Sequence, residues 1–180
     1  MTDIAETTTI QWGDLSQLAA FPTSTVASVT KSPDGRALSI LLEGLEARCD
    51  GNGINSATAI LVGSIEANIP TATDWTATRA DFRGQIALTD GARATIELGL
   101  ARAVDGQTLV VPLQAGTDSV DFTRTLYSPA EISPLTAEGE APSYAPLTIS
   151  IQLTVACAGK ASAALAAVDS IDLELWVRSR

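Results

Sequence analysis

Short runs in which apolar and polar residues alternate recur along the chain. The clearest run covers residues 147–155, where Leu, Ile and Val alternate with Thr, Ser and Gln. Residues 171–177 repeat the pattern, and residues 94–100 follow it more weakly. A period of two places every second side chain on the same side of an extended backbone, so each run predicts a strand with one buried face.

Turn signals separate these runs at short intervals. Asp-Gly and Asn-Gly pairs tolerate the positive φ angles that tight turns need. Regular turns between half-buried strands predict an all-β chain, a single antiparallel β-sandwich with a jelly-roll-like or Greek-key arrangement over residues 1–180. Trp12 and Trp75 are expected in or near its core. The turn signals lie in residues 32–35, 50–53, 89–91, 105–106 and 115–118.

Two segments depart from the simple pattern. Residues 161–168 are rich in Ala and have helix propensity, but the regular alternation that follows favours a strand or irregular structure there. Residues 128–146 hold four prolines, which interrupt strand pairing, and therefore predict a long surface loop.

Charge and histidine content exclude several classes of function. The chain of 180 residues has 11 Lys and Arg against 21 Asp and Glu, a net charge of −10, and no His. A strongly acidic protein is a poor partner for nucleic acid or for an anionic membrane surface. Without His there is no Ser-His-Asp or Cys-His nucleophile and no common zinc site. We therefore expect a protein that is not an enzyme and needs no cofactor.

The N-terminus and the cysteines bear on the cellular compartment. Residues 1–6 carry neither a basic nor an apolar segment, and no apolar run approaches the ~20 residues of a membrane span. These features fit a cytoplasmic protein or a mature secreted domain, and the abundance of Thr, Ser, Ala and Gly favours secretion. Cys49 and Cys157 stand far apart, which suits a disulfide, although two buried thiols are the alternative.

Two groups of residues are candidates for ligand binding. Asp50, Asn52 and Asn55 offer oxygen atoms in a short loop, as calcium sites do, but a plain turn is favoured because the twelfth position is Leu61 rather than Glu. Trp176 alternates with the buried positions of its strand, so its ring is expected partly outside. Trp176 and Tyr144 are candidates for stacking on a sugar, and packing under a loop or against another protein is the alternative.

Carboxylates and threonines offer two further candidate sites. Asp172 and Glu174 share one face of a predicted strand, and paired carboxylates are what a glycosidase needs. A solvated outer face explains them better. The threonines of residues 71–78 form a ladder of the kind that meets ice or a crystalline polymer, but strands favour Thr in any case.

Several short motifs together resemble a family of small secreted fungal and bacterial proteins that is catalogued only as a domain of unknown function. The resembling segments include Cys49, Pro70, Trp75 and the sequence Asp-Phe-Arg-Gly of residues 81–84. The family's first cysteine is absent, because residues 20–22 read Ala-Phe-Pro. The remaining resembling segments are residues 22–26, 32–35, 37–40, Leu88 and 156–159.

The resemblance implies a secreted β-sandwich and supplies no activity. It leaves Cys49 and Cys157 as the natural disulfide pair. It also makes Asp81 and Arg83 a structural pair beside a turn at Gly84, with Arg83 bound to Asp81 or to a neighbouring carboxylate.

These observations favour a non-catalytic extracellular protein that acts by contact with a partner protein or by self-association. The alternative from a different class is a lectin-like carbohydrate-binding module, with calcium as an assisting ion. A glycoside-active enzyme is the third hypothesis.

Overall fold

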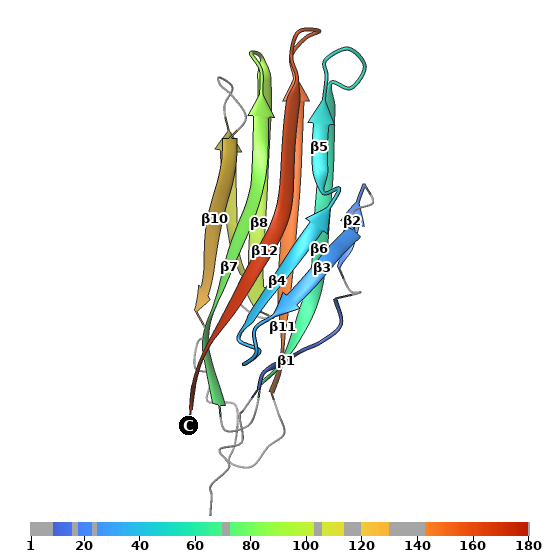
Figure 1. The fold of residues 1–180 in the computed structure, drawn as a ribbon. Helices are drawn as coiled ribbons and strands as arrows, with labels where there is room; N and C mark the ends of the chain where they lie inside the picture. Colours follow the sequence, from blue (N-terminus) through green and yellow to red (C-terminus); the bar gives the residue numbers. More distant parts are fainter. Residues whose placement is uncertain are drawn as a thin grey trace, which may run out of the picture.

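The computed structural model describes residues 9–15, 18–22, 25–69, 73–102, 106–113, 120–129 and 143–179. These residues form twelve strands in two antiparallel sheets that pack face to face as a long, narrow sandwich (Figure 1). Residues 130–142, the greater part of the predicted Pro-rich loop, lie outside the described residues. None of the described segments forms a helix suited to crossing a membrane.

The two sheets are named A and B. Sheet A has the order β1 (Gln11–Trp12), β6 (Ser56–Ile69), β11 (Ser143–Cys157), β8 (Ala92–Arg102) and β9 (Gly106–Leu113), and β2 (Ala19–Phe21) also pairs with β6. Sheet B has the order β10 (Val120–Pro129), β7 (Thr73–Leu88), β12 (Ala164–Ser179), β4 (Ala37–Glu43) and β3 (Thr25–Lys31), and β5 (Glu46–Cys49) also pairs with β12.

The chain passes repeatedly from one sheet to the other, as from β5 to β6, β6 to β7, β7 to β8 and β11 to β12. The two packed sheets confirm the predicted antiparallel β-sandwich, and repeated crossing between sheets is a feature of both arrangements that the sequence left open, the jelly roll and the Greek key. The Ala-rich segment is irregular up to residue 163 and then becomes the start of β12, so strand pairing overrides its helix propensity.

The core lies between the inner faces of the two sheets, and the predicted alternation of residues 147–155 and 171–175 is confirmed. Trp12 is also buried, and its indole N–H donates to the Gly35 carbonyl at 2.7 Å. The Trp75 side chain lies outside the description. The buried positions of these two runs are Leu147, Ile149, Ile151, Leu153, Val155, Ile171, Leu173 and Leu175.

Sheet B bends at one level across three strands. β12 shifts register between Val168 and Ser170, while the neighbouring strand is interrupted between β4 and β5 at Gly44, which has φ 81°. Gly84 lies opposite, in the middle of β7, where an added Cβ would be 2.0 Å from the Ala167 carbonyl oxygen. The predicted turn at Gly84 is therefore wrong: the glycine admits a close backbone approach within a continuous strand.

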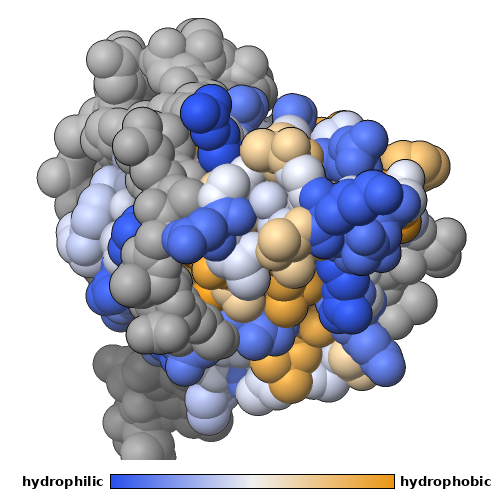
Figure 2. All heavy atoms as spheres, turned by 90° about the horizontal axis from the view of Figure 1, so that it is seen from above, coloured by the Kyte–Doolittle hydropathy of each residue, from blue (hydrophilic) through white to orange (hydrophobic). Residues whose placement is uncertain are grey.

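One disulfide joins the two sheets. Cys49 at the end of β5 is bonded to Cys157 at the end of β11, with 6.1 Å between their Cα atoms, as predicted. The turns after β7 and β11 meet at the same end, where the Ala158 N–H donates to the Gly91 carbonyl at 3.0 Å. Figure 2 looks down on this end and shows hydrophilic and hydrophobic side chains side by side.

Candidate functional site

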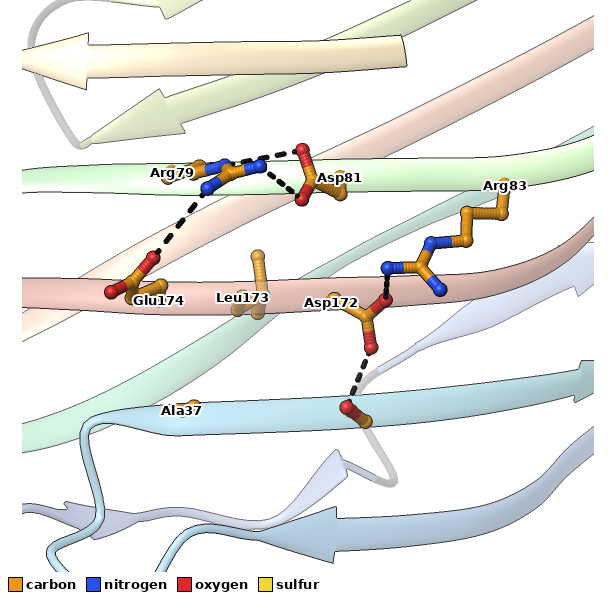
Figure 3. A pocket seen from close by; sticks show the side chains of 8 residues that line it. Ala37, Arg79, Asp81, Arg83, Asp172, Leu173 and Glu174 are labelled. Carbon is orange, nitrogen blue, oxygen red and sulfur yellow. Dashed lines mark hydrogen bonds and ion pairs between the residues drawn. The ribbon is translucent and has the colours of Figure 1, made fainter. Parts of the chain in front are cut away.

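The outer face of sheet B carries a lattice of charged side chains. Strand register places outward side chains of β10, β7, β12 and β4 in rows across the sheet. The lattice borders a shallow hollow of about 300 Å³ together with Ala37, Ser39 and Leu173 (Figure 3). We use "charged lattice" for its members Arg79, Asp81, Arg83, Asp172 and Glu174.

Arg79 and Asp81 form the most tightly connected part of the charged lattice. Arg79 Nη2 lies 2.8 Å from Asp81 Oδ2, and Arg79 Nε donates to Asp81 Oδ1 at 3.3 Å. Thr125 donates its hydroxyl to the same Asp81 oxygen at 2.5 Å. The hydrogen bond to Asp81, and then its charge, raise the pKa of Arg79. Arg79 also reaches Glu174 at 3.9 Å, so it bridges β7 and β12.

Arg83 and Asp172 form the second part. Arg83 Nη2 lies 3.1 Å from Asp172 Oδ2, and Ser39 donates its hydroxyl to Asp172 Oδ1 at 2.5 Å. The sequence left Asp81 or a neighbouring carboxylate as the partner of Arg83, and the structure selects the neighbour, Asp172. Asp172 and Glu174 do share one outward face, as predicted (Figure 3).

Two aromatic rings lie next to the charged lattice. Trp176 follows Glu174 by two residues on β12, and Tyr127 is the Cα partner of Arg79 on β10. Their side chains are 45% and 46% exposed, and the ring centroids are 6.1 Å apart with the planes tilted by 57°. Tyr127 thus supports one side of the indole, in the geometry that tilted aromatic pairs prefer.

The structure separates the two aromatic residues proposed from the sequence. Tyr144 belongs to β11 of sheet A, and its side chain lies outside the description. Tyr127, which the sequence analysis missed, accompanies Trp176 instead. Its outward position follows from the period-two burial of Phe122 and Leu126, but its closeness to Trp176 depends on register across β7.

The loop around Asp50 is held by its own carboxylate. Asp50 Oδ1 accepts hydrogen bonds from the backbone N–H groups of Asn52, Gly53 and Ile54 at 3.0 to 3.2 Å. The bond from Gly53, then those from Ile54 and Asn52, lower the pKa of Asp50. Asn55 accepts the Cys157 N–H through its backbone carbonyl.

This arrangement resembles an ordinary closed turn. Among the described residues there is no group of three or more His, Cys, Asp or Glu side chains that could hold a metal ion. Calcium binding by Asp50, Asn52 and Asn55 remains a prediction.

The outer face of sheet A is different in composition. Phe21 on β2 pairs with Ile60 on β6, and both side chains are exposed together with Val62. We call these three residues the apolar patch. Of the Thr ladder in residues 71–78, only the Thr78 side chain is described, and it is buried, so it cannot meet a surface outside the protein.

No family model matches the chain, and no curated protein matches it. Among solved structures, the chain is similar to TmCBM61, a carbohydrate-binding module determined in complex with β-1,4-galactotriose. The similarity covers 94% of this chain and 88% of that chain, with 12% sequence identity and a TM-score of 0.36. At that level it adds nothing to what the residues themselves indicate.

Proposed function

We propose that this protein is a non-catalytic carbohydrate-binding module that contacts its glycan with the outer face of sheet B. One observation carries the proposal: the exposed Trp176–Tyr127 pair lies beside a polar hollow. Sugar rings have apolar faces that stack on aromatic rings and hydroxyl edges that need donors and acceptors. The aromatic pair and the charged lattice supply these two kinds of contact next to each other.

Two of the three carboxylates of the hollow, Asp172 and Asp81, favour binding over catalysis. Both oxygens of Asp172 are engaged, one by Ser39 and one by Arg83. Both oxygens of Asp81 are engaged by Arg79, and one also by Thr125. A glycosidase needs one carboxyl to deliver a proton and another to act on the sugar or on water. Carboxylates fixed in this way serve better as positioned acceptors.

A glycan panel read by intrinsic fluorescence tests the proposal, with and without added calcium. The expected result is a saturable change that Trp176→Ala reduces by about tenfold or more in affinity, because the stacking ring is lost. Phe21→Ala is the matched control, since it removes an exposed aromatic ring from the other sheet. Equal binding by Trp176→Ala and the parent would contradict the proposal. If glycan binding required calcium and Asp50→Ala abolished that binding, the result would support the metal site.

A second candidate function is self-association through the apolar patch. Phe21 is 70% exposed and is the Cα partner of Ile60, and Val62 is exposed two positions further along β6. Such a group of exposed apolar side chains is unusual on a chain of net charge −10. Sedimentation equilibrium over a series of protein concentrations tests it. A concentration-dependent mass that Val62→Lys abolishes supports this function, whereas a constant monomer mass excludes it.

A further inference from the structure

We infer that the ligand of the sheet B outer face is a linear, uncharged polysaccharide that lies along β7 and β12; this inference rests on the proposed function. The relevant residues occupy alternate positions of two adjacent, antiparallel strands. On β12 they are Asp172, Glu174 and Trp176, and on β7 they are Arg79 and Arg83, with Asp81 between them.

The site is elongated in the direction of the strands. Trp176 stands four positions after Asp172, which is a distance of about 13 Å along the strand at its usual rise per residue. Arg83 likewise stands four positions after Arg79 on β7. A single sugar ring on Trp176 would leave the Arg83–Asp172 pair untouched. A chain of several sugars along the strands would contact both ends.

The charges of the site disfavour anionic sugars. The lattice has three carboxylates and two guanidinium groups, within a chain of net charge −10. Each arginine is already paired with a carboxylate of this chain, at 2.8 Å for Arg79 and 3.1 Å for Arg83. A uronate or sulfated sugar would have to displace Asp81 or Asp172 to reach them. Repulsion from these carboxylates would oppose that exchange.

The pattern of donors and acceptors suits hydroxyl groups. Arginine N–H groups and carboxylate oxygens alternate along the lattice, and a sugar hydroxyl can donate to one and accept from the other. Arg83 and Glu174 keep 57% and 48% of their side chains exposed, so both can make further hydrogen bonds. The hydroxyls of Ser39 and Thr125 hold Asp172 and Asp81 in place, which reduces the ordering that binding would otherwise require.

Calorimetric titration of the intact protein tests the inference. The neutral probes are galactan, xylan, β-glucan and mannan, with oligosaccharides of two, four and six units prepared from the strongest binder. Polygalacturonate is the anionic probe and chitosan the cationic probe. We expect a neutral probe to bind most tightly, with affinity rising about tenfold or more from two to six units because more of the site is filled. Added salt should change that affinity by less than about twofold.

Arg83→Gln separates the far end of the site from the aromatic end. It should weaken binding of the six-unit ligand about fivefold or more and leave the two-unit ligand unchanged, since a two-unit ligand stacked on Trp176 does not extend as far as Arg83. Arg93→Gln, the same change on the outer face of sheet A, should have no effect. Arg83 is more than half exposed, so the variant should fold, and its circular dichroism spectrum and Tm verify this.

The possible outcomes distinguish this inference from the proposed function. Tightest binding of polygalacturonate or chitosan would overturn the inference and leave glycan binding intact. Equal affinity for two and six units, or an unchanged six-unit affinity in Arg83→Gln, would overturn the elongated site in the same way. If none of the probes bound in a Trp176-dependent manner, the proposed function would fail with it.

Discussion

The two outer faces of the sandwich both belong to antiparallel sheets of six strands, but they carry different side chains. On sheet A the outward residues of adjacent β6, β11 and β8 include a row of three threonines, Thr58, Thr154 and Thr95, beside the apolar patch. On sheet B the equivalent outward positions carry the charged lattice and two aromatic rings. The alternation of apolar and polar residues is required only for the buried core, so the residue types at the outward positions can differ between the sheets. This difference in side chains supports the proposal of glycan binding on sheet B, and it sets the apolar patch apart as the surface of the second candidate function.

The largest effect should come from breaking the link between the two sheets. The Cys49–Cys157 bond closes a loop of 108 residues, and loss of such a constraint on the unfolded chain costs about 4–5 kcal/mol of unfolding free energy. We expect this loss in the double variant Cys49→Ala/Cys157→Ala, measured by urea denaturation. Because one core cluster joins both sheets, fluorescence and far-UV circular dichroism should still report the same transition. A loss below about 1 kcal/mol would mean that the sheets need no such link.

Alanine at one glycine of each sheet compares how tightly the sheets are packed. A Cβ at Gly84 in sheet B meets the Ala167 backbone oxygen at 2.0 Å, whereas at Gly99 in sheet A it meets the Ser150 hydroxyl at 2.2 Å. Backbone cannot move aside as a hydroxyl can, so Gly84→Ala should cost about 3 kcal/mol or more and Gly99→Ala about 1 kcal/mol. Thermal unfolding measures both. Gly53→Ala, where a Cβ has open space, is the control, and equal losses at Gly84 and Gly53 would refute the close approach.

A smaller difference separates the polar contacts of the two outer faces. Asp81→Ala removes a nearly buried carboxylate and leaves Arg79 without its closest partner, so we expect a loss of about 2 kcal/mol. Ser64→Ala removes a neutral contact with Thr148 at 3.3 Å on sheet A and should cost about 0.5–1 kcal/mol. The effect of Asp81→Ala should shrink in high salt, because the pair is charged. Urea titrations at two ionic strengths measure both, and identical salt responses would contradict the distinction.

The smallest effects concern pH and have opposite signs at two aspartates. The pKa of Asp50 lies below its ordinary value of 3.8 because of backbone hydrogen bonds. The ionised Asp50 therefore stabilises the folded state at pH values above 3.8, and this stabilisation is lost as the pH falls through the folded-state pKa. The pKa of Asp169, at the bend of sheet B, is raised by burial first and by Asp121 second. The protonated Asp169 therefore stabilises the folded state at pH values below 3.8, and this stabilisation is lost as the pH rises through the folded-state pKa.

Asparagine variants should separate these two cases. At neutral pH we expect Asp50→Asn to be less stable than the parent and Asp169→Asn more stable, with both differences fading in acid. Tm recorded from pH 3 to pH 7 tests this expectation. If Tm changed in the same direction in both variants, one of the two causes would be wrong: the backbone hydrogen bonds at Asp50, or the burial and the charge of Asp121 at Asp169.

The sequence predicted much of the fold because burial leaves a periodic trace. The alternation of residues 147–155 and 171–177 identified two strands, and Asp-Gly signals identified the turns at Gly35, Gly51 and Gly91, which all have positive φ. Gly84 was misassigned because a glycine required by a neighbouring strand looks, in the sequence, like a glycine required by a turn.

The candidate site was predicted only in part. The position of Trp176 followed from alternation, and Asp172 and Glu174 followed in the same way. Their partners did not, because Ser39 lies 133 residues from Asp172 and Tyr127 reaches Trp176 only through the register of β10 on β7. Register between strands far apart in the sequence depends on the whole packing of the sheet, which a local pattern does not encode.

The position of β12 has a consequence for how the protein is made. β12 lies in the middle of sheet B, yet it follows β3, β4, β7 and β10 in the chain. During synthesis the earlier strands leave the ribosome first. The edges of β7 and β4 that will pair with β12 then stay exposed to solvent until β12 inserts between them. A nascent chain in that state is exposed to aggregation and to chaperones, and it has no hollow and no Trp176. Glycan binding would therefore serve as a measure of completed folding.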